Sequence, residues 1–295
     1  MPEVHVQNES SDKVLSDNEK TEKIEEFRKM IEDCPTLNIR TDEIYLTRFL
    51  NVCEWNVTES YARMTKLFKL KFENPKWFSN KKLGEYQDIL DNHAKVMLAG
   101  RDKKGRRVYI TKMSQAGSMS LVDLAQIDDL WFEAMLDETE TLENGIVILL
   151  DMSGYNWRMM KWLAPGNVKV ASTKADLMPI NNMEVHVVNS SSLMNAAVSI
   201  VFPMLSQSIK DQIFFHYSNY PSLHEQVGRD ILPLEYGGLQ ENINCNDLTN
   251  YLFKYEDYLN KNYIYGYTAD PSQTVKDKKK GFFKSKDNRV IADSL

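Results

Sequence analysis

Gly145-Ile-Val-Ile-Leu-Leu-Asp151 is the stretch of sequence that decides the fold. Every position between Gly145 and Asp151 is apolar, as expected of a strand that is covered on both faces. Two more apolar segments follow as strand candidates, residues 185–188 and 213–217, with helical sequence between them. Strands that alternate with helices indicate βαβ units, so the sequence predicts an α/β fold with a mainly parallel sheet.

The residues before this strand predict a turn, another strand and a helix. Residues 100–105, GRDKKG, are typical of a turn, and residues 107–112 follow as a strand. Ser120 and Asp123 have the spacing of a capping pair. We therefore expect a helix that begins at this pair and ends at residues 144–145.

The first third of the chain is polar at its start and then helical. Residues 1–17 are polar and acidic with little to bury, which predicts a disordered N-terminus. In residues 18–95, apolar side chains recur at spacings of three and four in three segments, the second beginning near Asp42 and the third capped by Thr58. Short helices of this kind form small bundles, so residues 18–95 are interpreted as a helical domain.

Composition excludes several classes of protein. The chain of 295 residues is 42% hydrophobic and 26% charged, as in ordinary globular proteins, and no apolar run reaches the roughly 18 residues of a membrane span. The N-terminus has no apolar signal-peptide core, so a cytoplasmic location is expected. Three widely spaced cysteines, Cys34, Cys53 and Cys245, favour neither disulfides nor zinc, and the net charge of −6 argues against binding nucleic acid.

Local motifs for catalysis are absent from the sequence. It contains no dinucleotide fingerprint, phosphate-binding loop, nucleophile elbow or HExxH zinc motif, and its five histidines lack metal-ligand spacing. His186 lies within an apolar strand, which is more typical of a hydrogen-bonded core histidine than of a catalytic base. Asp151 ends its strand, where it can be a functional group or the cap of the next turn. These features rank an enzyme below a binding protein.

Residues 193–205, LMNAAVSIVFPML, predict an unusually apolar helix that breaks near Pro203. Its apolar side chains cover about two thirds of the circumference, and only Asn195 and Ser199 keep a polar stripe. Such a helix is buried or contacts something other than water. The pattern alone favours an ordinary core helix.

Five blocks of the sequence resemble, in order and spacing, the CRAL-TRIO family, which includes the tocopherol-transfer and cellular retinaldehyde-binding proteins. The resemblance runs from about residue 21 to residue 259. The blocks are DCP at 33–35 with RTDEIYLTRFL at 40–50, GRDKKGRRV at 100–108, NGIVILLDMSG at 144–154, EVHVVN at 184–189 and ILPLEYGG at 231–238.

The resemblance implies a helical N-terminal region beside a sheet domain, here residues 96–262, with a hydrophobic cavity that a lid helix closes. The helix after Asn189 has the position of that lid. It also implies a non-enzymatic, membrane-peripheral carrier, without cofactor or metal, that moves a tocopherol-, retinoid- or carotenoid-like lipid between membranes. Two alternatives stay open: a scaffold whose cavity is structural, and an enzyme acting on lipids.

Candidate ligand-binding residues follow from strand alternation, from the family and from the apolar helix. Any of them can equally be an ordinary core residue. They are Phe132, Leu136, Ile146, Ile148, Leu150, Met152, Val185, Val187, Leu193, Ala197, Ile200 and Val201.

One family feature is missing from this chain. The tocopherol-transfer protein binds phosphoinositide head groups through basic residues near the lid, and the matching positions here are Asn181, Met183, Ser208 and Gln212. These positions supply no cation for charge-assisted phosphate contacts. Phosphoinositide-driven exchange is therefore not expected from them, although Lys210 remains.

The C-terminal residues 263–295 are interpreted as a basic, flexible tail. Seven Lys or Arg and two Asp lie between residues 276 and 289, while the rest of the chain is acidic. Lysines interleaved with aromatic rings suit an anionic membrane surface, and a merely solvated tail is the alternative. The candidate membrane-binding residues are Lys278, Lys279, Lys280, Phe282, Phe283 and Lys284.

Overall fold

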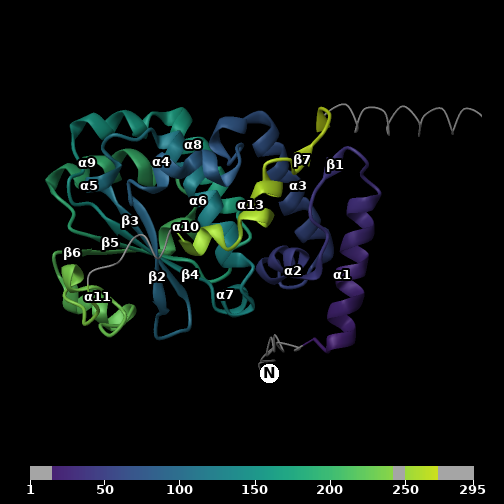
Figure 1. Cartoon of the computed structure of the whole chain (residues 1–295), viewed down its shortest axis with the longest axis horizontal. Helices are drawn as coiled ribbons and strands as arrows, with labels where there is room; N and C mark the ends of the chain where they lie inside the picture. Colours follow the sequence, from purple (N-terminus) through teal and green to yellow (C-terminus); the bar gives the residue numbers. More distant parts are fainter. Residues whose placement is uncertain (1–14, 242–249, 272–295) are drawn as a thin grey trace, which may run out of the picture.

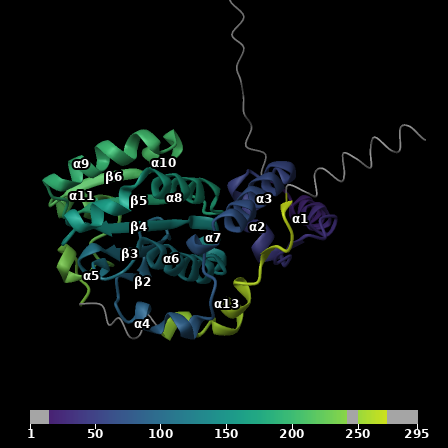
Figure 2. The same ribbon diagram turned by 90° about the horizontal axis from the view of Figure 1, so that it is seen from above.

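The computed structural model describes residues 15–241 and 250–271. A group of helices near the N-terminus lies beside a larger α/β part, as Figures 1 and 2 show from two directions. The predicted α/β class, with N-terminal helices and a mostly parallel sheet, is confirmed.

Three capped helices make up the N-terminal group. They are α1 (Asp17–Glu32), α2 (Glu43–Val52) and α3 (Val57–Glu73). Their apolar stripes meet in one core in which Phe27, Phe49 and Met64 are fully buried. The prediction that Thr58 caps the third helix is wrong, because the side chain of Asn56 accepts the backbone N–H of Glu59 at 3.1 Å and starts the helix earlier.

A five-stranded sheet forms the centre of the α/β part. Its strands are β2 (Lys95–Arg101), β3 (Arg107–Lys112), β4 (Ile146–Asp151), β5 (Glu184–Val188) and β6 (Ile213–Tyr217). The order is β2-β3-β4-β5-β6, with β2 antiparallel to β3 and the other neighbours parallel. The turn predicted at residues 100–105 begins too early, because Gly100 and Arg101 still belong to β2, and it joins a hairpin whose first strand was not predicted.

Helices connect and cover these strands. The α-helices are α4 (Gln87–Leu90), α5 (Met113–Ala116), α6 (Leu121–Leu136), α7 (Thr139–Asn144), α8 (Pro165–Leu177), α9 (Ser192–Val201), α10 (Gln207–Asp211), α11 (Tyr220–Gln226) and α13 (Glu256–Asn262). The 3₁₀ turns are η1 (Pro75–Trp77), η2 (Leu83–Tyr86), η3 (Trp157–Leu163), η4 (Phe202–Met204) and η5 (Leu234–Tyr236).

Helix α6 begins where the capping pair predicts. The side chain of Ser120 accepts the N–H of Asp123, and the carboxylate of Asp123 accepts the N–H of Ser120. The predicted end at residues 144–145 is wrong for this helix, because α6 stops at Leu136 and the separate α7 reaches Asn144.

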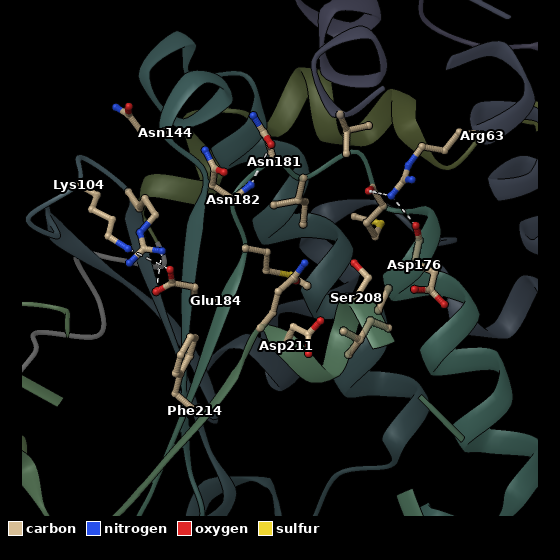
Figure 3. Close-up of a pocket in the computed structure, with 18 residues that line it drawn as sticks. Arg63, Lys104, Asn144, Asp176, Asn181, Asn182, Glu184, Ser208, Asp211 and Phe214 are labelled. Carbon is tan, nitrogen blue, oxygen red and sulfur yellow. Dashed lines mark hydrogen bonds and ion pairs between the residues drawn. The ribbon is translucent and has the colours of Figure 1, made fainter. Parts of the chain in front are cut away.

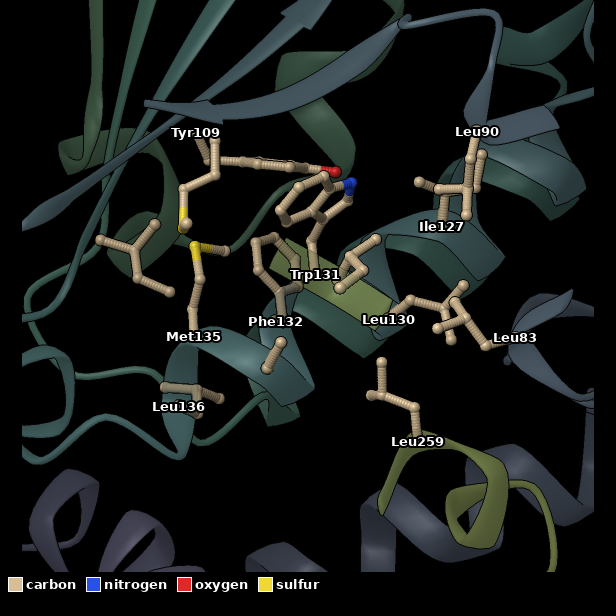
Figure 4. Close-up of a cluster of buried hydrophobic side chains, with 14 of the residues drawn as sticks. Leu83, Leu90, Tyr109, Ile127, Leu130, Trp131, Phe132, Met135, Leu136 and Leu259 are labelled. Atoms are coloured by element: carbon tan, nitrogen blue, oxygen red, sulfur yellow. The ribbon is translucent and has the colours of Figure 1, made fainter. Parts of the chain in front are cut away.

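Both faces of β4 are covered by other elements, as its unbroken apolar run predicts. On one face, Ile146 belongs to the cluster that also holds Tyr109 of β3 and Trp131 of α6. Figure 4 shows this cluster. On the other face, Val147 and Leu149 pack against α11 and η5. Burial of each such side chain stabilises the folded state by on the order of 1.5–3 kcal/mol, so the strand stabilises the packing of the layers on both of its faces.

A buried ion-pair cluster joins the N-terminal helices to the α/β part. The Arg48 side chain is 0% exposed, and its guanidinium lies 2.7 Å from Glu133 and 2.5 Å from Asp137, both on or next to α6. Arg40 also reaches Asp137 at 2.9 Å and lies over the ring of Tyr258. Buried charges need such partners, so the cluster fixes how α2 sits on α6.

The chain returns to the N-terminal helices after α13. Strand β7 (Gly266–Tyr267) pairs antiparallel with β1 (Leu37–Asn38), and Tyr265 and Tyr267 pack on the helical core. The predicted start of the tail at residue 263 is therefore too early. The two tyrosines have apolar surface to bury and fix the segment in place.

Candidate functional site

A cavity of about 380 Å³ lies against one face of the sheet, beneath α9. Its walls come from β4, β5 and β6, from η3 and α8, and from α9 with η4. Almost all lining side chains are apolar. The strands contribute Leu150, Val185, Val187, Ile213 and Phe215, and the segment after β4 contributes Met152 and Tyr155.

Strand alternation explains which side chains reach the cavity. Val185 and Val187 point into it from β5, while His186 between them points to the opposite face. On β6, Ile213 and Phe215 alternate in the same way. The cavity floor therefore follows directly from the period of two in these strands.

Helix α9 closes the cavity with one side only. Met194, Ala197, Val198 and Val201 recur at spacings of three and four and line the cavity. Ile200 lies on the outer side and is 42% exposed. The predicted break near Pro203 is present, because α9 ends at Val201 and continues as the 3₁₀ turn η4. An apolar helix with one face on a cavity and one toward solvent is the arrangement of a lid.

Helix α8 and turn η3 form a wall that the sequence analysis missed. Trp162, Val168, Ala171 and Ala175 line the cavity from these elements. The signal was present in the sequence: Pro165 suits the first turn of a helix, and the three apolar positions that follow are spaced by three and four.

The structure brings half of the predicted ligand-binding residues together at the cavity. These are Leu150, Met152, Val185, Val187, Ala197 and Val201.

The other six lie elsewhere. Phe132, Leu136 and Ile146 are buried in the cluster around α6, and Ile148 packs against that cluster. Leu193 lies outside the lining on α9, as does Ile200. The physical reason is that α6 covers the first half of β4, so only the carboxyl end of that face opens to the cavity.

Asp151 and His186 do not line the cavity, and both make hydrogen bonds within the fold instead. Asp151 accepts hydrogen bonds from the Ser153 N–H at 2.9 Å, from Asn189 at 2.9 Å and from the Tyr236 hydroxyl at 3.1 Å, which fits a turn cap. His186 is 0% exposed, with its Nδ1 2.8 Å from Nε2 of His216. Burial and the neighbouring His216 lower the pKa of His186 to about 4, so the ring is neutral near pH 7.

The described residues offer neither a metal-ion site nor a membrane-spanning helix. Residues 15–241 and 250–271 contain no cluster of His, Cys, Asp and Glu side chains arranged to hold a metal ion. Within the same ranges no helix combines the length and apolarity needed to cross a bilayer. The predicted membrane-binding segment, residues 278–284, lies outside the described residues.

Comparisons with known proteins agree with this architecture. Residues 91–238 match the model of the CRAL/TRIO domain, which is half of the chain. Clavesin-2 of Homo sapiens is 27% identical over 222 residues, 73% of this chain and 68% of that protein. Clavesin-1 of Xenopus laevis is 28% identical over 223 residues, 73% of this chain and 67% of that protein.

A solved structure shares the fold. The crystal structure of Sfh5 superposes with a TM-score of 0.56, covering 83% of this chain and 98% of that one at 11% sequence identity. With the sheet, the apolar cavity and the covering helix all in place, the domain match assigns the family: the chain belongs to the CRAL/TRIO domain family, whose members are in general non-catalytic proteins that bind hydrophobic lipids.

Proposed function

We propose that the protein binds one small hydrophobic lipid in the cavity beneath α9 and transfers it between membranes. The observation that carries this proposal is the cavity itself, about 380 Å³ in volume and lined almost wholly by apolar side chains. That volume lies within the range of small-molecule sites. Core packing normally fills such space, so a cavity of this size is suited to an occupant.

The lining restricts the chemistry of the ligand. Asn167 and Ser172 are polar members of the wall, and the hydroxyl of Tyr155 already contacts the sulfur of Met160. A charged group would lose its hydration here without gaining a partner, which costs far more than apolar contacts return. The ligand is therefore uncharged and largely hydrocarbon, a class that includes tocopherol-, retinoid- and carotenoid-like lipids.

The outer side of the lid supports release at a membrane. Ile200 and Met204 are exposed there, on α9 and η4. Releasing a lipid into water costs about 0.8 kcal/mol for each CH₂ group exposed. Opening against a bilayer avoids that cost, because the ligand and the apolar side chains both remain in an apolar medium.

A vesicle-transfer assay tests the proposal. Donor vesicles carry a fluorescent tocopherol or retinoid analogue, acceptor vesicles carry a quencher, and the full chain is added at increasing concentration. The transfer rate should rise in proportion to protein. A chain that binds the vesicles without accelerating transfer would instead be a scaffold, and a time-dependent chemical product from the analogue would make it an enzyme.

A further inference from the structure

Strand β6 is the edge strand of the five-stranded sheet, where it pairs with β5 along one side. Its pairing register breaks near its end, because Val187 lies opposite Phe215 whereas Val188 lies opposite Tyr217. His216 is therefore the extra residue of a β-bulge. Tyr217 has a φ of +54°, in the left-handed region, which strains the backbone of a residue other than glycine. The end of β6 is thus the weakest part of its attachment to the sheet.

Two buried histidines join β6 to β5 at this bulge. Nδ1 of His186 lies 2.8 Å from Nε2 of His216. A hydrogen bond between two imidazole nitrogens needs a proton on one nitrogen and none on the other. The bond survives one added proton, because a charged ring still donates to a neutral one. A second proton leaves two donors and two positive charges facing each other, so the bond is lost.

The carboxylate beside the pair is already shared by two cations. Glu184 lies 3.2 Å from Nε2 of His186, but it also lies 2.8 Å from Arg106 and 3.1 Å from Lys104. Figure 3 shows Glu184 and Lys104 in this arrangement. Arg106 has a second partner in Asp102, at 2.7 Å. Glu184 therefore balances the charge of a protonated histidine only in part.

Uncharged groups cover the other sides of the pair. The ring of Phe214 stacks on His186 with 5.2 Å between centroids, and Leu149 of β4 lies opposite His186 in the sheet. The hydroxyl of Ser222 on α11 contacts Nδ1 of His216. Burial, and then the neighbouring ring, lower the pKa of His186 to about 4, and burial lowers the pKa of His216. Both rings take up protons more readily once they meet water.

The same two strands form the floor of the apolar cavity. Val187, next to His186, lines the cavity from β5, and Phe215, next to His216, lines it from β6. The ring of Phe215 also contacts Phe202 of η4, the turn at the end of the lid, with 5.8 Å between centroids. Displacement of β6 therefore opens the floor and removes a contact of the lid at the same time.

We propose that the His186–His216 pair is an acid-sensitive latch, whose protonation releases β6 from β5 and opens the lid over the cavity. The inference rests on the proposed lipid carriage and adds a condition for release, a fall in pH. Opening returns His186 from a pKa of about 4 to its ordinary value of 6.5. By linkage, this change alone favours the open form roughly 25-fold at pH 5 relative to pH 7.5.

Lipid release at two pH values tests the latch. The full chain, loaded with a fluorescent tocopherol or retinoid analogue, is mixed in a stopped-flow instrument with neutral phosphatidylcholine vesicles at pH 7.5 and at pH 5, at equal ionic strength. Neutral vesicles keep electrostatic attraction to the membrane out of the comparison. We expect release at pH 5 to be faster by about 10- to 25-fold. Equal rates at the two pH values would overturn the proposal.

Amide variants identify the groups that titrate. His186→Asn keeps a polar atom near the position of Nδ1, His216→Gln keeps one near Nε2, and neither amide takes up a proton in this range. The double variant should release lipid at pH 5 within about threefold of its rate at pH 7.5. The control is His224→Gln on α11, where the ring contacts the main-chain oxygen of Tyr236 at 2.8 Å, and it should keep the wild-type acceleration. Wild-type acceleration in the double variant would assign the acid effect to other groups.

Hydrogen exchange of the wild-type chain reports the latch without any lipid. After correction for the intrinsic rate, the amides of β6 should exchange faster at pH 5 than at pH 7.5, while those of the central strand β4 stay protected. An equal loss of protection in both strands would mean that acid unfolds the whole α/β part, and the latch would be wrong. A chain that takes up no lipid contradicts the proposed function, whereas unchanged exchange of β6 in a chain that carries lipid contradicts the latch alone.

Discussion

Leu150 and Ile200 provide a matched pair at the apolar cavity. Leu150 lines it, whereas Ile200 lies on the outer side of the lid. A tryptophan at Leu150 should occupy the ligand's volume and lower the bound lipid severalfold. Stability should change by no more than about 1–3 kcal/mol, since added volume enters a cavity and not a filled core. The amount of lipid per protein chain is measured by mass spectrometry of an organic extract. The melting temperature is measured on the same samples.

The Ile200→Trp variant is the control for this substitution. It should keep the wild-type lipid content, because its side chain does not reach the ligand. If both variants lose lipid equally, or neither does, the assignment of the inner and outer sides of α9 is wrong.

The pair of histidines on β5 and β6, His186 and His216, makes stability depend on pH. His186 contacts His216 at 2.8 Å, and its ring stacks on Phe214. Its pKa is about 4 in the fold against 6.5 as its ordinary value. The unfolded chain therefore binds more protons between these values, and stability present above pH 6.5 is lost as the pH falls toward 4. The loss should be on the order of 3 kcal/mol.

Urea unfolding at pH 7 and pH 5 measures this effect. His186→Phe should be less stable than wild type at pH 7 but should lose less stability on acidification. An equal loss in the two proteins would assign the acid sensitivity to other groups.

At the scale of the element, the Ser206 hydroxyl ties the C-terminal end of the lid to α8. The Ser206 hydroxyl donates to Asp176 of α8 at 2.7 Å and accepts the N–H of Ile209 at 3.2 Å as the cap of α10. Ser206→Ala removes both contacts. The loss of the helix cap alone should lower the stability of this segment by about 1 kcal/mol. If closure depends on this end, ligand release should quicken by about fivefold.

The release rate is measured by stopped-flow transfer of a fluorescent lipid to vesicles. Ser199→Ala is the control, because that hydroxyl donates to the main-chain oxygen of Asn195 on the exposed side of α9. Release that is unchanged in Ser206→Ala, or changed equally in both variants, would show that this end does not hold the lid.

Elements were predicted from the sequence more successfully than the cavity. The unbroken apolar run of β4 and the capping pair before α6 are local signals, and both led to the correct element. Which half of β4 lines the cavity depends on how far α6 extends along the strand, and no residue of the strand encodes that distance. The side of α9 that faces the cavity could not be predicted from the sequence either, because apolar side chains occupy most of the circumference of this helix.

At the scale of the whole molecule, Arg48 connects the two parts of the fold. Replacing it with Ala leaves the partly buried Glu133 without its cation and leaves Asp137 with Arg40 alone. Breaking a fully buried pair costs about 3–5 kcal/mol, and we expect the lower end of that range because both carboxylates keep some contact with water. Urea unfolding should show that decrease, while Lys69→Ala, which breaks the exposed pair with Glu73, should cost less than about 1 kcal/mol. Equal costs would mean that the Arg48 cluster contributes no more than a surface pair.

The arrangement of the parts followed only partly from the sequence. The order of the blocks predicted helices followed by a sheet domain. The return of the chain, where β7 pairs with β1, joins residues more than two hundred positions apart, and two-residue strands carry no period to detect. A second, polar cavity of about 790 Å³ is likewise assembled from α3, the β2–β3 turn and α10, segments that lie far apart in the sequence (Figure 3).

Native mass spectrometry of the purified full chain shows whether the cavity beneath α9 holds one hydrophobic lipid, as we propose. We expect a complex with close to one uncharged lipid per chain. An organic extract then identifies that lipid, and the Leu150→Trp variant should lose it. A wild-type chain that carries no lipid, and that takes up none from vesicles containing tocopherol, retinoids or carotenoids, would contradict it.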